Sequence, residues 1–188
     1  ARERIKRIGV DGIVAEKGYV PVNGFMETSA PDIYAIGDVV NTPWLAHIAS
    51  AEGILAVERM HGEEARPLNY DQTPSCTYCE PEVASVGLTQ AQAGEKYGAD
   101  NVEAYEYNLG GNGKSQILGT TGFVKLVREK DGPVVGVHMV GARVGELIGE
   151  GQLVVNWEAY PGDGATLIHA HAVHRQRIQH FVADDDGL

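Results

Sequence analysis

The sequence is poor in cysteine and in basic residues, and it contains no long hydrophobic run. Only 2 of its 188 residues are cysteines, and 26 acidic residues outnumber 15 basic ones, which gives a formal charge of −11. A negatively charged chain is repelled by phosphates, so nucleic acid is not an expected partner. No stretch approaches the roughly 20 apolar residues of a membrane-spanning helix, so no membrane partner is expected. Hydrophobic residues make up 43% of the chain, enough for a globular core.

The two cysteines are not expected to form a redox disulfide or a zinc site. Cys76 and Cys79 are three positions apart around the segment 75–78, which has the pattern of a strand. That spacing sends the two side chains to opposite faces, whereas a disulfide needs converging Cβ atoms. A structural zinc site would need a second ligand pair at suitable spacing, and the sequence has no other cysteines. We therefore expect two reduced thiols, as in a cytoplasmic protein.

The most informative segment runs from Thr28 to Asp38. Residues 33–36 are apolar without alternation, which is typical of a parallel strand buried on both faces. Gly37 permits a close approach between the backbone and a ligand. Asp38 follows at the position where open α/β sheets bind ligands, beyond the carboxyl ends of their strands. A carboxylate there suits the hydroxyl groups of a sugar or sugar alcohol.

A helix is expected next, from Trp44 to about Met60. Thr42 is a candidate N-cap, and Pro43 suits the first helical position. Small residues recur along the helix and would let it lie close to a sheet or a cofactor: Ala46, Ala49, Ala51, Gly53 and Ala56. Its N-terminus would offer N–H groups and partial positive charge to an anion.

The second part of the chain follows a linker at 66–74 and has the pattern of an α+β domain. The turn signal at 129–132 predicts a hairpin, and Thr89 and Gln92 have the spacing of a capping box. A further helix with an apolar stripe at Leu147, Ile148, Leu153 and Val154 is expected from about Val144 to Trp157. Short strands are expected at 75–78, 83–86, 102–107, 123–128 and 134–140.

These motifs resemble the flavoprotein disulfide reductases, which are pyridine nucleotide-disulfide oxidoreductases. The segment 28–38 is similar to the family's second flavin-binding motif, and residues 74–89 are similar to the start of its dimerisation domain. The resemblance implies that residues 1–66 are the C-terminal part of a doubly wound α/β FAD-binding domain. Residues 67–188 would be an antiparallel-sheet dimerisation domain flanked by helices, with an atypical tail from about residue 172.

The resemblance also implies which residues bind FAD. Asp38, after Gly37, would bind the ribityl chain. The start of the following helix would lie against the pyrimidine edge of the flavin, through residues Trp44, Leu45, Ala46 and His47. The backbone role of this stretch does not depend on His47, whose side chain fits an ordinary helix surface equally well.

The run Ile168-His169-Ala170-His171 narrows the resemblance to the dihydrolipoyl dehydrogenases. The second histidine of such a run is their catalytic base, so His171 would be the base here and would reach the partner's flavin site across a homodimer. Imidazole titrates near neutral pH and suits proton transfer with a dithiol. The family's orienting glutamate falls on Gln176, which brings no negative charge to support the base.

Four histidines near the C-terminus are a further candidate, as ligands of a metal ion. His169, His171, His174 and His180 lack a cysteine or carboxylate at convincing ligand spacing, and Arg175 and Arg177 add positive charge. We expect no metal, and we expect His174 and His180 to be solvated.

The family's Gly-x-Gly-x-x-Gly fingerprints and its redox cysteine pair are missing from the sequence. We therefore expect the C-terminal part of an enzyme that oxidises dihydrolipoamide to lipoamide with FAD and NAD, and little FAD retention by this chain alone. The resemblance implies a homodimer and, as partners, the lipoyl-bearing acyltransferase components of 2-oxo acid dehydrogenase complexes. A noncatalytic dimerisation module and a glutathione- or mercuric-reductase-like specificity stay open as alternatives.

Overall fold

The computed structural model describes residues 13, 16–165, 167 and 168. The chain forms two compact units, and the division between them falls after Tyr70. Among the described residues, no helix is long and apolar enough to cross a membrane.

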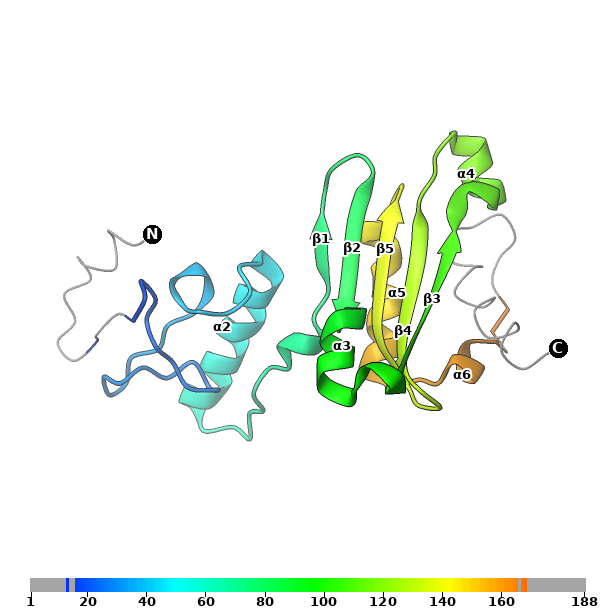
Figure 1. The fold of residues 1–188 in the computed structure, drawn as a ribbon. Helices are drawn as coiled ribbons and strands as arrows, with labels where there is room; N and C mark the ends of the chain where they lie inside the picture. The colour runs from blue at the N-terminus through cyan, green and yellow to red at the C-terminus, as the bar shows by residue number, and fades with distance from the viewer. Residues whose placement is uncertain (1–12, 14–15, 166, 169–188) are drawn as a thin grey trace. The chain divides into compact units, whose positions relative to one another are not determined.

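The first unit is built from one long helix and the irregular chain that packs on it (Figure 1). The helix, α2, spans Ala46–His61 and ends at Gly62, whose left-handed backbone donates to the carbonyl of Arg59. A glycine in this conformation is the usual helix C-cap. A short 3₁₀ helix, η1, spans Gly37–Val39, and a second one, η2, spans Tyr70–Gln72 at the division between the two units. Met26, Leu55 and Ala56 form the centre of the core.

The predicted buried strand at 33–36 is not found as a strand in the described residues. Tyr34 forms only an isolated antiparallel bridge with Glu27, and Ile36 is 40% exposed. A strand buried on both faces needs neighbours that pair with its backbone on each side. The described part of this unit supplies one such neighbour, residues 26–28, and no parallel strand.

The predicted N-cap of α2 is also wrong. The helix begins at Ala46, and its N-cap is Leu45, which makes no side-chain capping bond. The amide of Leu45 donates to the carbonyl of Pro43, 2.9 Å away, so a tight turn precedes the helix. This turn keeps Thr42 and Pro43 outside the first helical turn, where a capping side chain has to lie.

The second unit contains a five-stranded antiparallel sheet in the order β1-β2-β5-β4-β3 (Figure 1). All five strands lie within two residues of the predicted ranges, and the hairpin between β4 and β5 is confirmed. The strands are β1 (Ser75–Thr77), β2 (Glu82–Gly87), β3 (Val102–Asn108), β4 (Phe123–Glu129) and β5 (Val134–Gly141).

One face of this sheet carries the main core and is covered by α5, which spans Val144–Asn156. Strand register places buried apolar residues in rows across the sheet. Ala84 and Val124 both pair with Met139, and the next row pairs Val86 and Leu126 with Val137. Side chains alternate along a strand, so these rows share one face. Burying these rows against a helix stabilises this unit.

The apolar stripe of α5 faces this sheet. Ile148 is buried, and Leu147 and Val154 pack against the same core. These side chains are therefore covered by the sheet of the same unit. The exposed apolar residues of this region are Leu153, at 46%, and Trp157, at 73%.

The opposite face carries α3, which spans Gln90–Tyr97. The amine of Lys125 on β4 donates to Gln90 at 2.9 Å, and Lys125 points away from its buried neighbours Val124 and Leu126. The predicted capping box is confirmed, with Thr89 and Gln92 bonded to each other's backbone amides.

Two short helices were not predicted: α4 at Gly113–Leu118 and α6 at Pro161–Ala165. The buried side chain of Asn112 caps α4 by accepting from the amides of Lys114 and Ser115. The 3₁₀ helices η3 and η4 span Ala99–Asn101 and Leu109–Gly111.

Candidate functional site

A hairpin-like turn leads the chain toward Asp38. The amide of Ala35 donates to the carbonyl of Met26, and the amide of Thr28 donates to the carbonyl of Ile33. The Thr28 hydroxyl lies 2.9 Å from the Ile33 carbonyl and also accepts from the amide of Ala30. This hydroxyl therefore closes the turn, which gives the threonine of the motif a structural role.

At the end of this turn, Gly37 changes the direction of the chain. Its φ of +72° is a left-handed conformation that favours glycine, and an added Cβ would lie 3.4 Å from the Cβ of Ala49 on α2. The Val40 amide donates to the Gly37 carbonyl and closes η1. Asp38 is the second residue of η1, and its side chain is exposed.

A buried acid on α2 holds this turn. Glu52 has 0% of its surface exposed, and its Oε2 accepts from the Gly37 amide at 2.7 Å. Its Oε1 accepts from the Tyr70 hydroxyl at 3.0 Å. Burial raises the pKa of Tyr70 to about 12, and the bond to Glu52 adds to the shift. The tyrosine is therefore protonated at neutral pH and able to donate.

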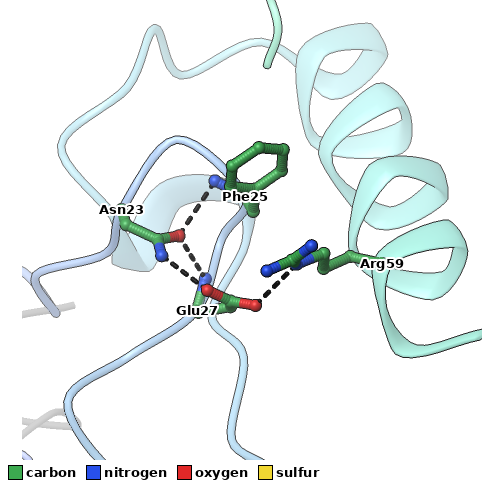
Figure 2. A network of polar contacts seen from close by, with 4 residues as sticks. All are labelled: Asn23, Phe25, Glu27 and Arg59. Carbon is green, nitrogen blue, oxygen red and sulfur yellow. Dashed lines mark hydrogen bonds and ion pairs between the residues drawn. The ribbon is translucent and has the colours of Figure 1, made fainter. Parts of the chain in front are cut away.

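A second polar network attaches the hairpin-like turn before Asp38 to α2 (Figure 2). The Asn23 side chain accepts from the amides of Phe25 and Glu27, and Glu27 accepts from Arg59 at 2.8 Å. The Arg59 guanidinium also lies over the Phe25 ring, 4.8 Å from its centre. Its hydrogen bond to Glu27 lowers the pKa of that carboxyl.

The N-cap residue of α2, Leu45, makes no side-chain capping hydrogen bond. Trp44 is 59% exposed and lies against Tyr19, with 5.7 Å between the ring centres. Leu45 is half-buried, and Ala46 and His47 are exposed. Leu45 supplies no capping side chain to the first-turn N–H groups, which carry the partial positive charge of the helix N-terminus.

A hollow of about 500 Å³ lies in the first unit. Its walls come from residues between Glu16 and Met26, together with Asn41, Thr42 and Tyr70. The Thr42 hydroxyl is buried without a hydrogen-bond partner among the described residues. Asp38 does not line this hollow, and neither do the predicted flavin-facing residues at 44–47.

The cysteines behave as ordinary thiols. Both are free: Cys76 is half-buried in β1, and Cys79 is exposed after it. Burial raises the pKa of Cys76, and the charge of Glu82 adds to this, which disfavours the reactive thiolate. Within the residues that the structure describes, no group of three metal-ligating side chains occurs. The predicted base His171 and its neighbour Gln176 lie outside the described residues.

Sequence reasoning missed Glu52 and Tyr70. Their partners lie 15 and 18 residues away, and no local motif joins them. The sequence does contain one indication of the role of Glu52. Ala49, Glu52 and Gly53 lie on one face of α2 by their spacing. An acidic residue thus lies among small residues on a helix face that was expected to pack closely.

Comparisons with known proteins give the family. A model described as the dimerisation domain of pyridine nucleotide-disulphide oxidoreductases matches residues 73–181. The chain belongs to this family. A second model, described as pyridine nucleotide-disulphide oxidoreductase, matches residues 3–53. The antiparallel-sheet unit thus corresponds to the family's dimerisation domain, and the family assigned from the sequence is confirmed.

The curated relatives are named dihydrolipoyl dehydrogenase. One from Bacillus subtilis is 38% identical over 187 residues, covering 97% of this chain and 39% of the relative. One from Zymomonas mobilis is 43% identical over 149 residues, covering 77% of this chain and 32% of the relative. The chain thus spans less than half the length of these relatives.

A solved structure of LpdA from Mycobacterium tuberculosis has the same fold. It superposes with a TM-score of 0.83 at 23% identity, covering 96% of this chain and 39% of that one. The family's α+β architecture, expected from the sequence, is therefore confirmed.

Proposed function

We propose that the chain is the C-terminal part of an FAD-dependent oxidoreductase that oxidises dihydrolipoamide to lipoamide with NAD as acceptor. The observation that carries this proposal is the 38% identity to a dihydrolipoyl dehydrogenase across 97% of the chain. The domain assignment, with an FAD-binding part at 1–66 and a dimerisation domain at 67–188, belongs to the same proposal.

The residues around Asp38 fit FAD chemically. Asp38 is an exposed carboxylate at the end of a turn whose glycine already adopts a left-handed conformation. Such a carboxylate would accept hydrogen bonds from the hydroxyls of the ribityl chain. The first-turn N–H groups of α2, near Trp44, Leu45, Ala46 and His47, would stabilise negative charge on a flavin ring. When bound, FAD and NAD would supply the electron transfer.

His171 is proposed as the base that takes a proton from the dithiol substrate and later returns it. Removing this proton makes the thiolate, which is the form that attacks a disulfide. Gln176, where the family has its orienting glutamate, would hydrogen-bond the imidazole without adding negative charge. The base would serve the flavin site of a second copy, so the proposed enzyme is a homodimer.

The proposal includes the partners and setting implied by the family. Lipoyl-bearing acyltransferase components of 2-oxo acid dehydrogenase complexes would carry the dithiol. The free thiols Cys76 and Cys79 are compatible with a cytoplasmic location, where thiols are kept reduced.

The flavin role of Asp38 is tested with Asp38→Asn and its matched control Asp32→Asn. Both substitutions remove one exposed carboxylate from the same turn region. In the complete gene product, Asp38→Asn should weaken FAD binding about tenfold or more, and Asp32→Asn should leave it unchanged. The absorbance of flavin at about 450 nm, divided by the protein concentration, measures the amount of bound cofactor.

Three results would count against the proposal. Unchanged FAD affinity in Asp38→Asn would remove the assigned role of that carboxylate. A complete gene product that binds no flavin and does not oxidise dihydrolipoamide would instead favour the noncatalytic dimerisation module. A flavoprotein that reduces glutathione disulfide or mercuric ion would favour the other open alternative.

A further inference from the structure

Glu52 is a buried acid that the proposed chemistry does not use. Its side chain is completely buried in the first unit, and both carboxyl oxygens have donors. Burying a carboxylate costs free energy that its hydrogen bonds must offset. A glutamine or an apolar residue would fill the same space at a lower cost, so the acid is expected to have a specific task.

The helix surface around Glu52 is shaped to meet the backbone that precedes Asp38. A Cβ on Gly53 would lie 3.4 Å from Ile36, and a Cβ on Gly37 would lie 3.4 Å from Ala49. Positions 49, 52 and 53 fall on one face of a helix. Small residues at 49 and 53 thus let the chain at 36–37 approach α2 closely, and Glu52 stands between them.

Without Glu52, the backbone N–H of Gly37 would lack a hydrogen-bond acceptor. Gly37 is the first residue of η1, so its N–H has no partner within that helix, and the N-cap Ile36 makes no side-chain capping bond. Glu52, 15 residues later, supplies the acceptor at 2.7 Å. The acid therefore acts as a long-range cap for the 3₁₀ turn that contains Asp38.

We propose that Glu52 is a positioning residue for FAD binding, which holds the Gly37–Asp38 turn against α2 while Tyr70 holds its second oxygen. The inference rests on the proposed function, because Asp38 is there assigned to the ribityl chain. Tyr70 fixes Oε1, so the carboxyl plane has one orientation, and Oε2 is directed at the Gly37 amide. Two bonds define a rotamer better than one.

The test measures FAD affinity in the complete flavoprotein with Glu52→Ala, Asp38→Asn and the double variant. Glu52→Ala should weaken FAD binding about tenfold. In the Asp38→Asn background the same change should have little further effect, because Glu52 acts through Asp38. Glu58→Gln, which removes an exposed acid from the same helix, is the control and should bind FAD normally.

A second measurement, amide hydrogen exchange at Gly37 in the 188-residue chain, does not require flavin. Exchange at this amide should accelerate in Glu52→Ala and, to a smaller extent, in Tyr70→Phe, with no such change in Glu58→Gln. If Glu52→Ala fails to fold, Glu52→Gln carries both measurements, since its amide oxygen accepts from Gly37 without the negative charge. We expect it to weaken FAD binding less than the alanine variant would, about threefold.

The outcomes separate the two proposals. Normal FAD affinity in Asp38→Asn overturns the proposed flavin role and, with it, the positioning role. Weakened binding in Asp38→Asn with normal binding in the Glu52 variants overturns the positioning role alone. Additive effects in the double variant, or unchanged exchange at Gly37, also overturn it, because the acid then does not act through this turn.

Discussion

At the scale of single residues, two carboxylates of this chain accept hydrogen bonds from backbone N–H groups far away in the sequence, and one amide side chain caps a helix locally. Glu52 accepts from Gly37, Glu82 accepts from Gly145, and Asn112 caps the helix that follows it. A buried amide without a partner costs about 1–3 kcal/mol, so these side chains have larger effects than exposed ion pairs, which contribute about 0–1 kcal/mol.

The ion pair between Glu27 and Arg59 should stabilise the first unit in a pH-dependent way. The pKa of Glu27 is lowered by its hydrogen bond to Arg59, from an ordinary value of 4.5. A lowered carboxyl pKa gives stabilisation that is fully present above 4.5 and is lost as pH falls through the lowered value. Glu27→Gln should therefore reduce the unfolding free energy at pH 7 and have no effect in strong acid.

Urea unfolding of both proteins between about pH 2 and 7 checks this prediction. The difference should also shrink in about 1 M salt, because the pair is exposed and screened. A difference that stays constant across the whole pH range would mean that Glu27 stabilises the hairpin through its neutral hydrogen bonds alone.

At the scale of elements, features that depend on a few neighbouring residues were predicted correctly. Features that depend on partners far away in the sequence were not. The five strands and the capping box of Thr89 followed from alternation and local spacing. The strand expected at 33–36 failed because burial on both faces depends on neighbouring strands, which a local pattern does not supply. The six-residue α4 was missed because it is too short to show a period.

The same division applies to the candidate site. Gly37 and Asp38 form a 3₁₀ turn, whereas the sequence placed them directly after a buried strand. Glu52 and Tyr70 were missed, since nothing near them in the sequence identifies their partners. The start of α2 was misplaced by a few residues because the turn at Pro43 replaced the expected cap.

The start of α5 depends on an acid from another element. Its own N-cap, Arg143, has a left-handed backbone and makes no side-chain capping bond. Glu82 on β2 accepts from the Gly145 amide at 2.9 Å instead. Glu82→Ala should therefore destabilise the second unit by about 0.5–2 kcal/mol.

Chemical denaturation followed by circular dichroism would measure this loss. Glu106→Ala, which removes an exposed acid from β3, is the control and should change stability by less than about 0.5 kcal/mol. Equal effects of the two substitutions would show that the Glu82 contact does not cap the helix.

At the scale of the whole molecule, the dimerisation domain leads us to expect self-association. The exposed apolar residues Leu153 and Trp157, four positions apart on and just after α5, are candidates for the interface. Sedimentation of the chain at micromolar concentration should show a dimer. Leu153→Glu with Trp157→Glu should shift it toward monomer, whereas Ala91→Glu on α3 should not.

A strict monomer for the unmodified chain would contradict this expectation. A dimer that resists both glutamate substitutions would place the interface elsewhere in the domain and leave the self-association itself in place.

The hydroxyl of Tyr70 has a practical consequence for dissecting this protein. Because the sequence predicts a linker at 66–74, residue 66 is an obvious place to truncate the chain. That truncation would separate Tyr70 from the first unit. In the isolated upstream part, the buried Glu52 would then keep its bond from Gly37 and lose the hydrogen bond that Tyr70 donates to its other oxygen. Truncation experiments that isolate the first unit should therefore end after residue 70, so that the FAD affinity measured for it is not an artefact of the cut.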